Sequence, residues 1–378
     1  MKKIALIGST GSIGKQTLSV VRRHPDKFKI VSLAAGNNVG EFLEQVKEFS
    51  PKVATLSSVA PLSQDFPKST EYFFGEYAFT NAIIEDADIV VVALVGFKGI
   101  IAVLDAIEKG KNVALATKES LVVGGSLVME KAKEKGVSIT PIDSEHSAVW
   151  QALDFDFNKP FKKIILTCSG GAFRDLSKDQ LKMVTAKDAL KHPNWNMGAK
   201  ITIDCATLVN KGFEVIEAKW LYNTSFDKID VIIHRESIIH SMVEYVDGSV
   251  IAQMSNPSMI IPISLALSYP ERVQTTVKGL SFGELKRLTF EDVDKKRFPC
   301  FDLVLTAAKE GATYPAVANG ASEQAVELFL KGLIGYNDIY KGIYGALQAF
   351  DGGHHVRIDD LTEADEFSRR YVKELFGV

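Results

Sequence analysis

The sequence predicts an α/β protein with a doubly wound, Rossmann-like N-terminal domain, a central α+β domain and a C-terminal helical bundle. Three observations lead to this prediction. Short β-branched runs alternate with helical patterns over the first part of the chain, which is typical of a parallel sheet wrapped by helices. A glycine-rich turn, residues 8–14, follows the first of these runs. Segments with helical spacing and polar breaks end the chain.

The N-terminal domain is expected to span residues 1–143. Its expected strands are residues 3–7, 29–34, 53–56, 89–93, 113–116 and 137–141, and its expected helices are residues 14–23, 41–49, 99–108 and 121–135. In such a domain, ligands bind at the carboxyl ends of the parallel strands. Residues that follow the strands are therefore the first candidates for a functional site.

The remainder is expected to form a mixed domain, residues 144–269, a charged linker, residues 270–299, and a helical domain, residues 300–378. In the mixed domain the expected strands are residues 163–167, 229–234 and 250–254, and the expected helices are residues 208–220 and 260–267. In the last domain the expected helices are residues 301–309, 316–331, 337–350 and 362–376.

Composition narrows the class of partner. With 378 residues, 46% of them hydrophobic, the chain can bury a large core. A net charge of -3 without a long basic run argues against nucleic acid or an anionic membrane surface. The longest apolar runs fall short of the ~20 residues that a membrane span needs, and the first run reads as a strand and not a leader. Three cysteines without C-x-x-C spacing fit a reducing cytoplasm, so a small-molecule site is expected.

The glycine-rich turn has the spacing G-x-x-G-x-x-G and opens into a helix. Small residues allow a pyrophosphate to approach the backbone, and the helix N-terminus offers free N–H groups. The alternative is that these glycines only allow tight packing between strand and helix. The next strand ends at residues 34–38, where an NAD-dependent enzyme usually has an acidic residue for the ribose. None is present, which favours NADPH.

Two groups of polar residues predict a metal site. In an extended segment Asp143 and Glu145 would point to the same face, with Ser144 beside them, and carboxylate oxygens favour Mg²⁺ or Mn²⁺. The alternative is a helix start that Asp143 or Ser144 caps. Asn210 and Glu214 lie four residues apart, so on a helix they would share a face, although a solvated amphipathic helix is the alternative.

Three further segments carry polar residues in settings that suit a ligand. Residues 116–121 follow a buried-looking strand, and residues 167–171 form another strand followed by a glycine turn that could hold a phosphate. Residues 187–198 are turn-prone and are expected to be a lid. Taken singly, each of these patterns is more often structural. The histidines at 234, 240, 354 and 355 are interpreted as structural or surface residues.

In combination these segments resemble the 1-deoxy-D-xylulose 5-phosphate reductoisomerase family over nearly the whole chain. The matching stretches, in order, are GSTGSIG, ATKESLV, PIDSEHSA, TCSGGAFR, HPNWNMG, DCATLVNKGFEVIEA, HRESIIHSMVE and FPCFDLVLTAA. The resemblance implies NADPH- and divalent-metal-dependent conversion of 1-deoxy-D-xylulose 5-phosphate into 2-C-methyl-D-erythritol 4-phosphate, in non-mevalonate isoprenoid biosynthesis. It also implies a homodimer.

The resemblance implies a role for each matching residue. The metal ligands would be Asp143, Glu145 and Glu214. The NADPH contacts would be Thr10, Gly11, Ser12, Ile13, Gly36, Asn37, Asn38, Thr117, Glu119 and Gly198. The substrate contacts would be Lys118, Ser144, Glu145, Ser169, Cys205, Asn210, Lys211 and Glu214, under a lid that carries His192, Trp195 and Met197. The residues of the chemical step would be Lys118, His192 and the three metal ligands. Thr117 stands where the family has Asn, and Cys205 where it has Ser.

In the expected chemistry the metal chelates the ketone and a neighbouring hydroxyl, and the rearranged aldehyde then takes hydride from NADPH. The residues do not decide between a retro-aldol/aldol route and a direct alkyl shift. One rival interpretation is an NADPH-dependent reductase of the semialdehyde or homoserine dehydrogenase type, which shares the glycine turn. Another is a non-catalytic NADPH-sensing regulator, which would not need three convergent carboxylates.

Overall fold

The computed structural model describes residues 1–58, 66–191, 194–195, 197–353 and 355–378. The described residues divide into two compact units. Unit 1 contains Met1–Thr117, Val128–Ser147 and Ser258–Val277. Unit 2 contains Lys118–Leu127, Ala148–Pro257 and Lys278–Val378.

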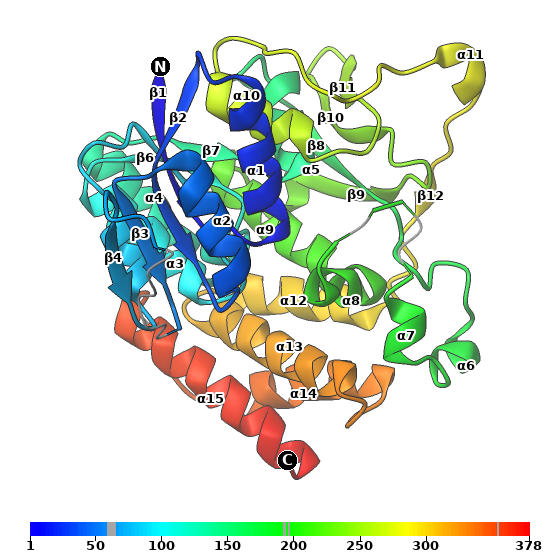
Figure 1. The fold of residues 1–378 in the computed structure, drawn as a ribbon. Coiled ribbons are helices and arrows are strands. Elements are labelled where there is room, and N and C mark those ends of the chain that lie inside the picture. Colours follow the sequence, from blue (N-terminus) through cyan, green and yellow to red (C-terminus); the bar gives the residue numbers. More distant parts are fainter. Residues whose placement is uncertain (59–65, 192–193, 196, 354) are drawn as a thin grey trace. The chain divides into compact units, whose positions relative to one another are not determined.

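Among the described residues of unit 1, seven parallel strands form one sheet in the order β4-β3-β2-β1-β5-β6-β7 (Figure 1). The strands are β1 (Lys2–Ile7), β2 (Phe28–Ala35), β3 (Val53–Leu56), β4 (Glu71–Phe74), β5 (Ile89–Val92), β6 (Asn112–Leu115) and β7 (Ile139–Pro141). The chain winds outward from β1 in both directions, so the switch point at which such sheets bind ligands lies between β1 and β5. The predicted doubly wound fold is confirmed.

One face of this sheet is covered by α1 (Ser12–Arg23), α2 (Val39–Phe49) and α10 (Ile260–Ser268). Side chains alternate along β1, so Ile4 and Leu6 enter the core with Leu18, Phe42 and Ile263 of the three helices. Helix α3 (Lys98–Glu108) packs against β5 and β6. Because α10 contributes to this core, residues 258–277 belong to unit 1, whereas the sequence placed α10 in the central domain.

Two of the five points at which the chain passes between the units lie inside helices, namely α4 (Glu119–Lys135) and α5 (Ser144–Ala152). Helix α4 is interrupted at Gly124, where φ is -141° and ψ is 38°. Helix α5 begins immediately after Asp143. The segment that contains Asp143 and Glu145 is therefore the start of a helix, and the prediction of an extended segment was wrong.

Unit 2 contains, within the described ranges, a five-stranded sheet in the order β11-β10-β8-β9-β12. The strands are β8 (Lys163–Cys168), β9 (Ile229–Ile233), β10 (Ile239–Glu244), β11 (Val250–Met254) and β12 (Glu291–Asp292). Only β8 and β9 pair in parallel, and the other described pairings are antiparallel. The predicted strands at 163–167, 229–234 and 250–254 are present, and the sequence missed β10 and β12.

The remaining α-helices in the described part of unit 2 are α6 (Lys178–Leu181), α7 (Ala186–Ala189), α8 (Ala199–Thr207), α9 (Val209–Leu221), α11 (Phe282–Leu285), α12 (Pro299–Glu310), α13 (Tyr314–Leu330), α14 (Tyr336–Ala349) and α15 (Ile358–Phe376). Helix α12 packs closely on α9, because a Cβ on Gly212 would lie 3.0 Å from Val304. The helices α12–α15 confirm the predicted C-terminal helical region (Figure 1). By its contacts this region belongs to unit 2.

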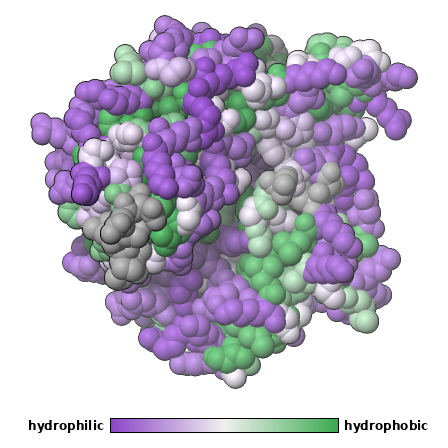
Figure 2. All heavy atoms as spheres, viewed as in Figure 1, coloured by the Kyte–Doolittle hydropathy of each residue, from purple (hydrophilic) through white to green (hydrophobic). Residues whose placement is uncertain are grey.

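Within the described residues, no helix is both long enough and apolar enough to cross a membrane. The face of the molecule drawn in Figure 2 is mostly hydrophilic, and apolar residues reach it in separate patches. This distribution is ordinary for a globular protein.

Candidate active site

The glycine turn of unit 1 connects β1 to α1, as predicted. Gly8 has a φ of +96°, and a Cβ there would lie 2.3 Å from the carbonyl oxygen of Ala93. A Cβ on Gly14 would lie 2.2 Å from the carbonyl oxygen of Gly8. The first and last glycines are therefore required by packing, and the role of the turn in binding has to come from the residues between them.

Those residues leave the start of α1 open to an anion. Gly11 is the N-cap, no side chain among the described residues caps the helix there, and the first turn contains no acidic residue. The first N–H groups of a helix have no partner within it, and they carry the positive end of its dipole. A phosphate is a natural ligand for such a helix end.

The segment after β2 holds the second part of the predicted cofactor site, Gly36, Asn37 and Asn38, which are exposed. Asn38 caps α2, because its Oδ1 accepts a hydrogen bond from the backbone of Glu41 at 3.3 Å. Glu41, which was not among the predicted cofactor residues, contributes a carboxylate to this first turn. That carboxylate pairs with Lys15 at 3.0 Å, so its negative charge is partly compensated.

Thr117 follows β6 and is buried. Its hydroxyl donates to the carbonyl oxygen of Leu94 at 2.6 Å. Because that hydroxyl has one hydrogen, it is left with acceptor capacity towards a cofactor. The Asn that the family has at this position would offer a donor as well.

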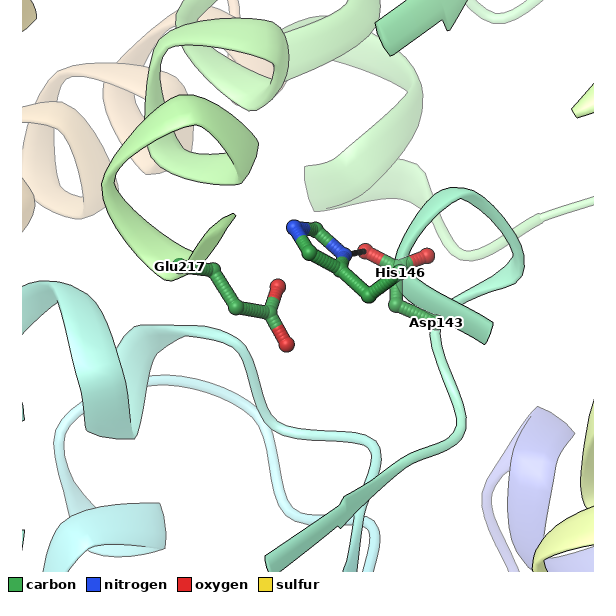
Figure 3. Close-up of side chains that lie close together, drawn as sticks. All are labelled: Asp143, His146 and Glu217. Atoms are coloured by element: carbon green, nitrogen blue, oxygen red, sulfur yellow. Dashed lines mark ion pairs between the residues drawn. The ribbon is translucent and has the colours of Figure 1, made fainter. Parts of the chain in front are cut away.

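Asp143, Glu145 and His146 lie at the start of α5 in unit 1. Each can offer a ligand atom, and those of Asp143 lie within 4.8 Å of those of Glu145 and of His146. Ser144 donates its backbone N–H to Asp143 Oδ1 at 3.0 Å and its hydroxyl to Glu145 Oε2 at 2.6 Å. Figure 3 shows the pairing of Asp143 with the buried His146, whose Nδ1 lies 3.6 Å from Asp143 Oδ2.

The position of Asp143 is compatible with both of its interpretations, as a residue at a helix start and as a metal ligand. The residue precedes the first turn of α5 and its carbonyl oxygen accepts from Ser147, as at a helix start. Its carboxylate also lies near that of Glu145, and a pair of carboxylates needs a cation or a proton. Oxygen donors of this kind are what Mg²⁺ and Mn²⁺ prefer, so the donor set fits the predicted metal.

Glu214 on α9 is the centre of a buried charged cluster in unit 2. Lys118 Nζ lies 3.0 Å from Glu214 Oε1, and Lys211 Nζ pairs with Oε2. Asn210 donates to the same carboxylate from one helical turn away. Glu214, Lys211 and Lys118 are only 1%, 2% and 6% exposed. The predicted helix face is therefore real, and the alternative of a solvated helix is wrong.

Lys211 also links this cluster to the turn after β8, because its ammonium donates to the carbonyl oxygen of Thr167 at 2.6 Å. In that turn Gly170 and Gly171 have φ values of +81° and +73°. A Cβ on Gly171 would lie 2.4 Å from the carbonyl oxygen of Cys205. The turn therefore packs directly on the end of α8 and brings Ser169 and Cys205 into one region of unit 2.

Two of the three cysteines are poor nucleophiles. Burial and the nearby Glu214 carboxylate raise the pKa of the Cys205 thiol well above its ordinary value. Burial likewise raises the pKa of Cys300 to about 12. Since the thiolate is the reactive form, neither residue suits covalent catalysis near neutral pH.

A second ionic cluster, in which Asp204 is buried and Lys200 and Glu119 are partly exposed, adjoins the N-terminus of α4. Lys200 of α8 lies 2.6 Å from Asp204 and 3.4 Å from Glu119. Burial raises the pKa of Asp204. The pairing of Glu119 with Lys200 was not predicted from the sequence, because no local pattern joins residues 119 and 200.

The predicted lid, residues 187–198, begins within α7 and ends at Gly198, the N-cap of α8. His192 lies outside the described residues. Trp195 packs edge-on against His240 of β10, with 6.1 Å between ring centroids. His240, interpreted from sequence as structural, therefore contacts the predicted lid.

Two buried residues that were not predicted for the site lie three positions after predicted metal ligands. His146 lies three residues after Asp143, and Glu217 lies three residues after Glu214 on α9. Glu217 is the third side chain drawn in Figure 3. Their spacing could have indicated these two residues from the sequence, because residues three positions apart lie on the same side of a helix.

Comparison with known proteins agrees with this geometry. Family profiles of 1-deoxy-D-xylulose 5-phosphate reductoisomerase match residues 4–125, and those of its C-terminal domains match residues 139–222 and 254–371. The 1-deoxy-D-xylulose 5-phosphate reductoisomerases of Chlorobium limicola and a Geobacillus species are 47% and 45% identical to this chain. These alignments cover 100% and 99% of this chain and 100% of each relative.

Solved structures show the same likeness. The reductoisomerase from Zymomonas mobilis in complex with NADPH has a TM-score of 0.92 and 36% identity, with 99% of each chain covered. A reductoisomerase in complex with NADPH, fosmidomycin and magnesium has a TM-score of 0.94 and 36% identity, and covers 100% of this chain and 98% of its own. With relatives of this identity along its whole length, this chain belongs to the 1-deoxy-D-xylulose 5-phosphate reductoisomerase family.

Proposed function

We propose that the chain converts 1-deoxy-D-xylulose 5-phosphate into 2-C-methyl-D-erythritol 4-phosphate with NADPH and a divalent cation, Mg²⁺ or Mn²⁺. The observation that carries the proposal is the buried cluster of Lys118, Lys211 and Asn210 around Glu214. It places two cations and an amide where an anionic, oxygen-rich substrate can be held. Family membership and the relatives' names supply the reaction.

The metal is proposed to bind Asp143, Glu145 and Glu214. The donor chemistry supports this choice, since all three are carboxylates and two of them lie at one helix start. When bound, the cation would polarise the ketone and stabilise the oxyanion that forms as the carbon skeleton rearranges. Ser144, which donates to Glu145, would hold that carboxylate in its binding orientation.

The substrate phosphate is proposed to bind Ser169, Cys205, Asn210 and Lys211. Lys211 can exchange part of its pairing with Glu214 for a phosphate oxygen, and the amide of Asn210 can do the same. Lys118 and Ser144 would meet the carbonyl end. A buried ammonium such as that of Lys118 can neutralise charge or transfer a proton as the reaction proceeds. His192, Trp195 and Met197 would exclude water as the lid.

The pyrophosphate and the adenosine ribose of NADPH are proposed to bind residues of unit 1, and NADPH would supply the hydride. Thr10, Gly11, Ser12 and Ile13 offer the open start of α1 to the pyrophosphate. Gly36, Asn37 and Asn38 would receive the ribose end, and Thr117, Glu119 and Gly198 the nicotinamide end. The Lys200 ammonium beside Glu119 would fix the position of that carboxylate.

A semialdehyde dehydrogenase, one of the rival enzymes, needs a thiolate nucleophile, and the raised pKa values of Cys205 and Cys300 oppose one at these two of the three cysteines. A non-catalytic NADPH sensor would have no use for a buried cluster of two lysines and a carboxylate. A cytoplasmic location and the lack of a nucleic-acid partner stay predictions from composition.

We also propose a homodimer, assembled through β11. This strand is at the edge of the described sheet of unit 2 and exposes Val250 and Ile251, with Val246 exposed just before it. Edge strands with exposed apolar side chains readily pair with another chain. Ile251→Lys should therefore halve the mass measured by light scattering, and an unchanged dimer mass would exclude β11 as the interface.

The function is tested by incubating the protein with 1-deoxy-D-xylulose 5-phosphate, NADPH and Mg²⁺. Loss of NADPH absorbance should require all three, stop with chelator and return with added metal. Carbon NMR should show a branched product, which a simple reductase would not make. Oxidation of NADPH that yields an unbranched alcohol would overturn the proposal.

A further inference from the structure

The connection between β9 and β10, residues 234–237, has an unusual and well-fixed conformation. Ser237 has a φ of +52°, the left-handed region that residues other than glycine seldom adopt. The buried His234 holds the turn, because its Nε2 accepts from the N–H of Ile238 at 3.2 Å and its Nδ1 lies 2.9 Å from the carbonyl oxygen of Thr289. Strain of this kind persists where the surrounding structure holds it, often at functional positions.

One residue of the predicted lid is bound to this turn. The amide nitrogen of Asn194 donates to the backbone oxygen of Arg235 and to the hydroxyl of Ser237, both at 2.6 Å. The next residue, Trp195, packs against His240 of the adjoining strand. The left-handed backbone of Ser237 thus serves to present a hydroxyl and a carbonyl side by side to one amide group.

Two side chains of the turn, those of Arg235 and Glu236, also bind neighbouring elements. Arg235 lies 2.8 Å from Asp175, which follows the glycine turn after β8, and it pairs with Glu291 of β12. Glu236 accepts from the hydroxyl of Thr289 at 2.8 Å. Exposed ion pairs are individually weak, but these contacts join the buried His234 in holding the turn from several directions.

We propose that the turn formed by residues 234–237 is a fixed binding site for the lid. Asn194 is then a positioning residue, because its hydrogen bonds to this turn set the position of the adjacent Trp195. The inference rests on the proposed function, because it assigns the lid a role in holding the sugar phosphate. Asn194 acts through its neighbour and touches no reacting atom. Its loss should therefore weaken substrate retention more than it slows the chemical step.

The test compares Asn194→Ala and Ser237→Gly with the control Asn81→Ala. Asn81 also makes an amide-to-carbonyl bond, 3.3 Å from Nδ2 to the oxygen of Ala78, and it belongs to unit 1, whereas Asn194 and Trp195 belong to unit 2. In the ligand-free protein, hydrogen exchange over residues 187–198 should rise about fivefold for each lid variant, as expected for a lost hydrogen bond. It should not change in the control. The KM for the substrate should rise in the lid variants, with kcat nearly unchanged.

Ser237→Gly separates positioning from stability. Glycine suits a φ of +52°, so this variant should melt at or above the wild-type temperature while its lid exchanges faster. Ser237→Asn, which tolerates the left-handed region and keeps an acceptor, should restore slow exchange. The proposal is overturned if both lid variants exchange like the control. Because exchange is measured without substrate, it decides this point even if the wild-type protein turns over no 1-deoxy-D-xylulose 5-phosphate, which would overturn only the proposed function.

Discussion

Replacing Gly171 with alanine should damage the phosphate site from a position that touches no ligand. Gly171 has a φ of +73°, and its Cβ would lie 2.4 Å from the carbonyl oxygen and 2.8 Å from the carbonyl carbon of Cys205. The left-handed conformation costs a residue other than glycine about 1–2 kcal/mol. The contact adds roughly 1–3 kcal/mol, because both neighbouring atoms are backbone and the turn has to move.

Gly248 provides a matched control. Its φ is +85°, and a Cβ there would have no atom within 4 Å among those considered. Gly248→Ala should therefore lose only the conformational part, about 1–2 kcal/mol, whereas Gly171→Ala should lose roughly 2–5 kcal/mol. Urea unfolding of both variants gives the two free energies directly.

The functional consequence separates the two variants more sharply. Displacement of the turn moves Ser169 away from Lys211, so the KM for 1-deoxy-D-xylulose 5-phosphate should rise at least tenfold in Gly171→Ala, a change of about 1.4 kcal/mol in binding. It should stay near the wild-type value in Gly248→Ala. Equal unfolding free energies and equal KM values for the two variants would refute the reasoning.

Three further predictions follow from the remaining sites. Asn37→Lys should enlarge the preference for NADPH over NADH in kcat/KM, since the added cation attracts the 2′-phosphate, and an unchanged ratio would count against this placement. Cys205→Ser should lower the KM for the sugar phosphate because a hydroxyl is the stronger donor, and an unaltered KM would remove Cys205 from the phosphate site. Asp86 pairs with Lys3 and Lys52, which lower its pKa to about 2. A lowered carboxyl pKa stabilises the fold above the unfolded pKa of ~3.9, and this stabilisation is lost as the pH falls towards 2. In urea unfolding, the difference in unfolding free energy between the wild type and Asp86→Asn should therefore narrow over that pH range. A constant difference would contradict the prediction.

Much of the fold was predictable from local pattern. The alternation of apolar runs with helical spacing located all the described strands of the doubly wound sheet except β4, none of whose residues is fully buried. The local sequence pattern did not show which helix packs against which sheet. Helix α10 is apolar on most sides, and nothing in its sequence indicates that it covers the sheet of unit 1.

The candidate site shows the same division. Helical spacing predicted that Asn210 and Glu214 share a face of α9, and the structure adds that the face is buried against Lys118. The period-two argument for Asp143 and Glu145 failed because a helix begins between them, although their carboxylates still lie close together. The contact of Lys200 with Glu119 joins residues far apart in sequence, which periodicity does not detect.

The most direct test of the account is the metal dependence of turnover in Asp143→Asn. Asparagine caps a helix about as well as aspartate, so the start of α5 and the melting temperature should be retained, and NADPH should still bind. If Asp143 is a metal ligand, the affinity for Mg²⁺ or Mn²⁺ should fall, and turnover should drop by several powers of ten, because the cation supplies several kcal/mol of stabilisation to the developing charge. Near wild-type turnover at ordinary metal concentrations would contradict the account and leave Asp143 as a helix cap alone.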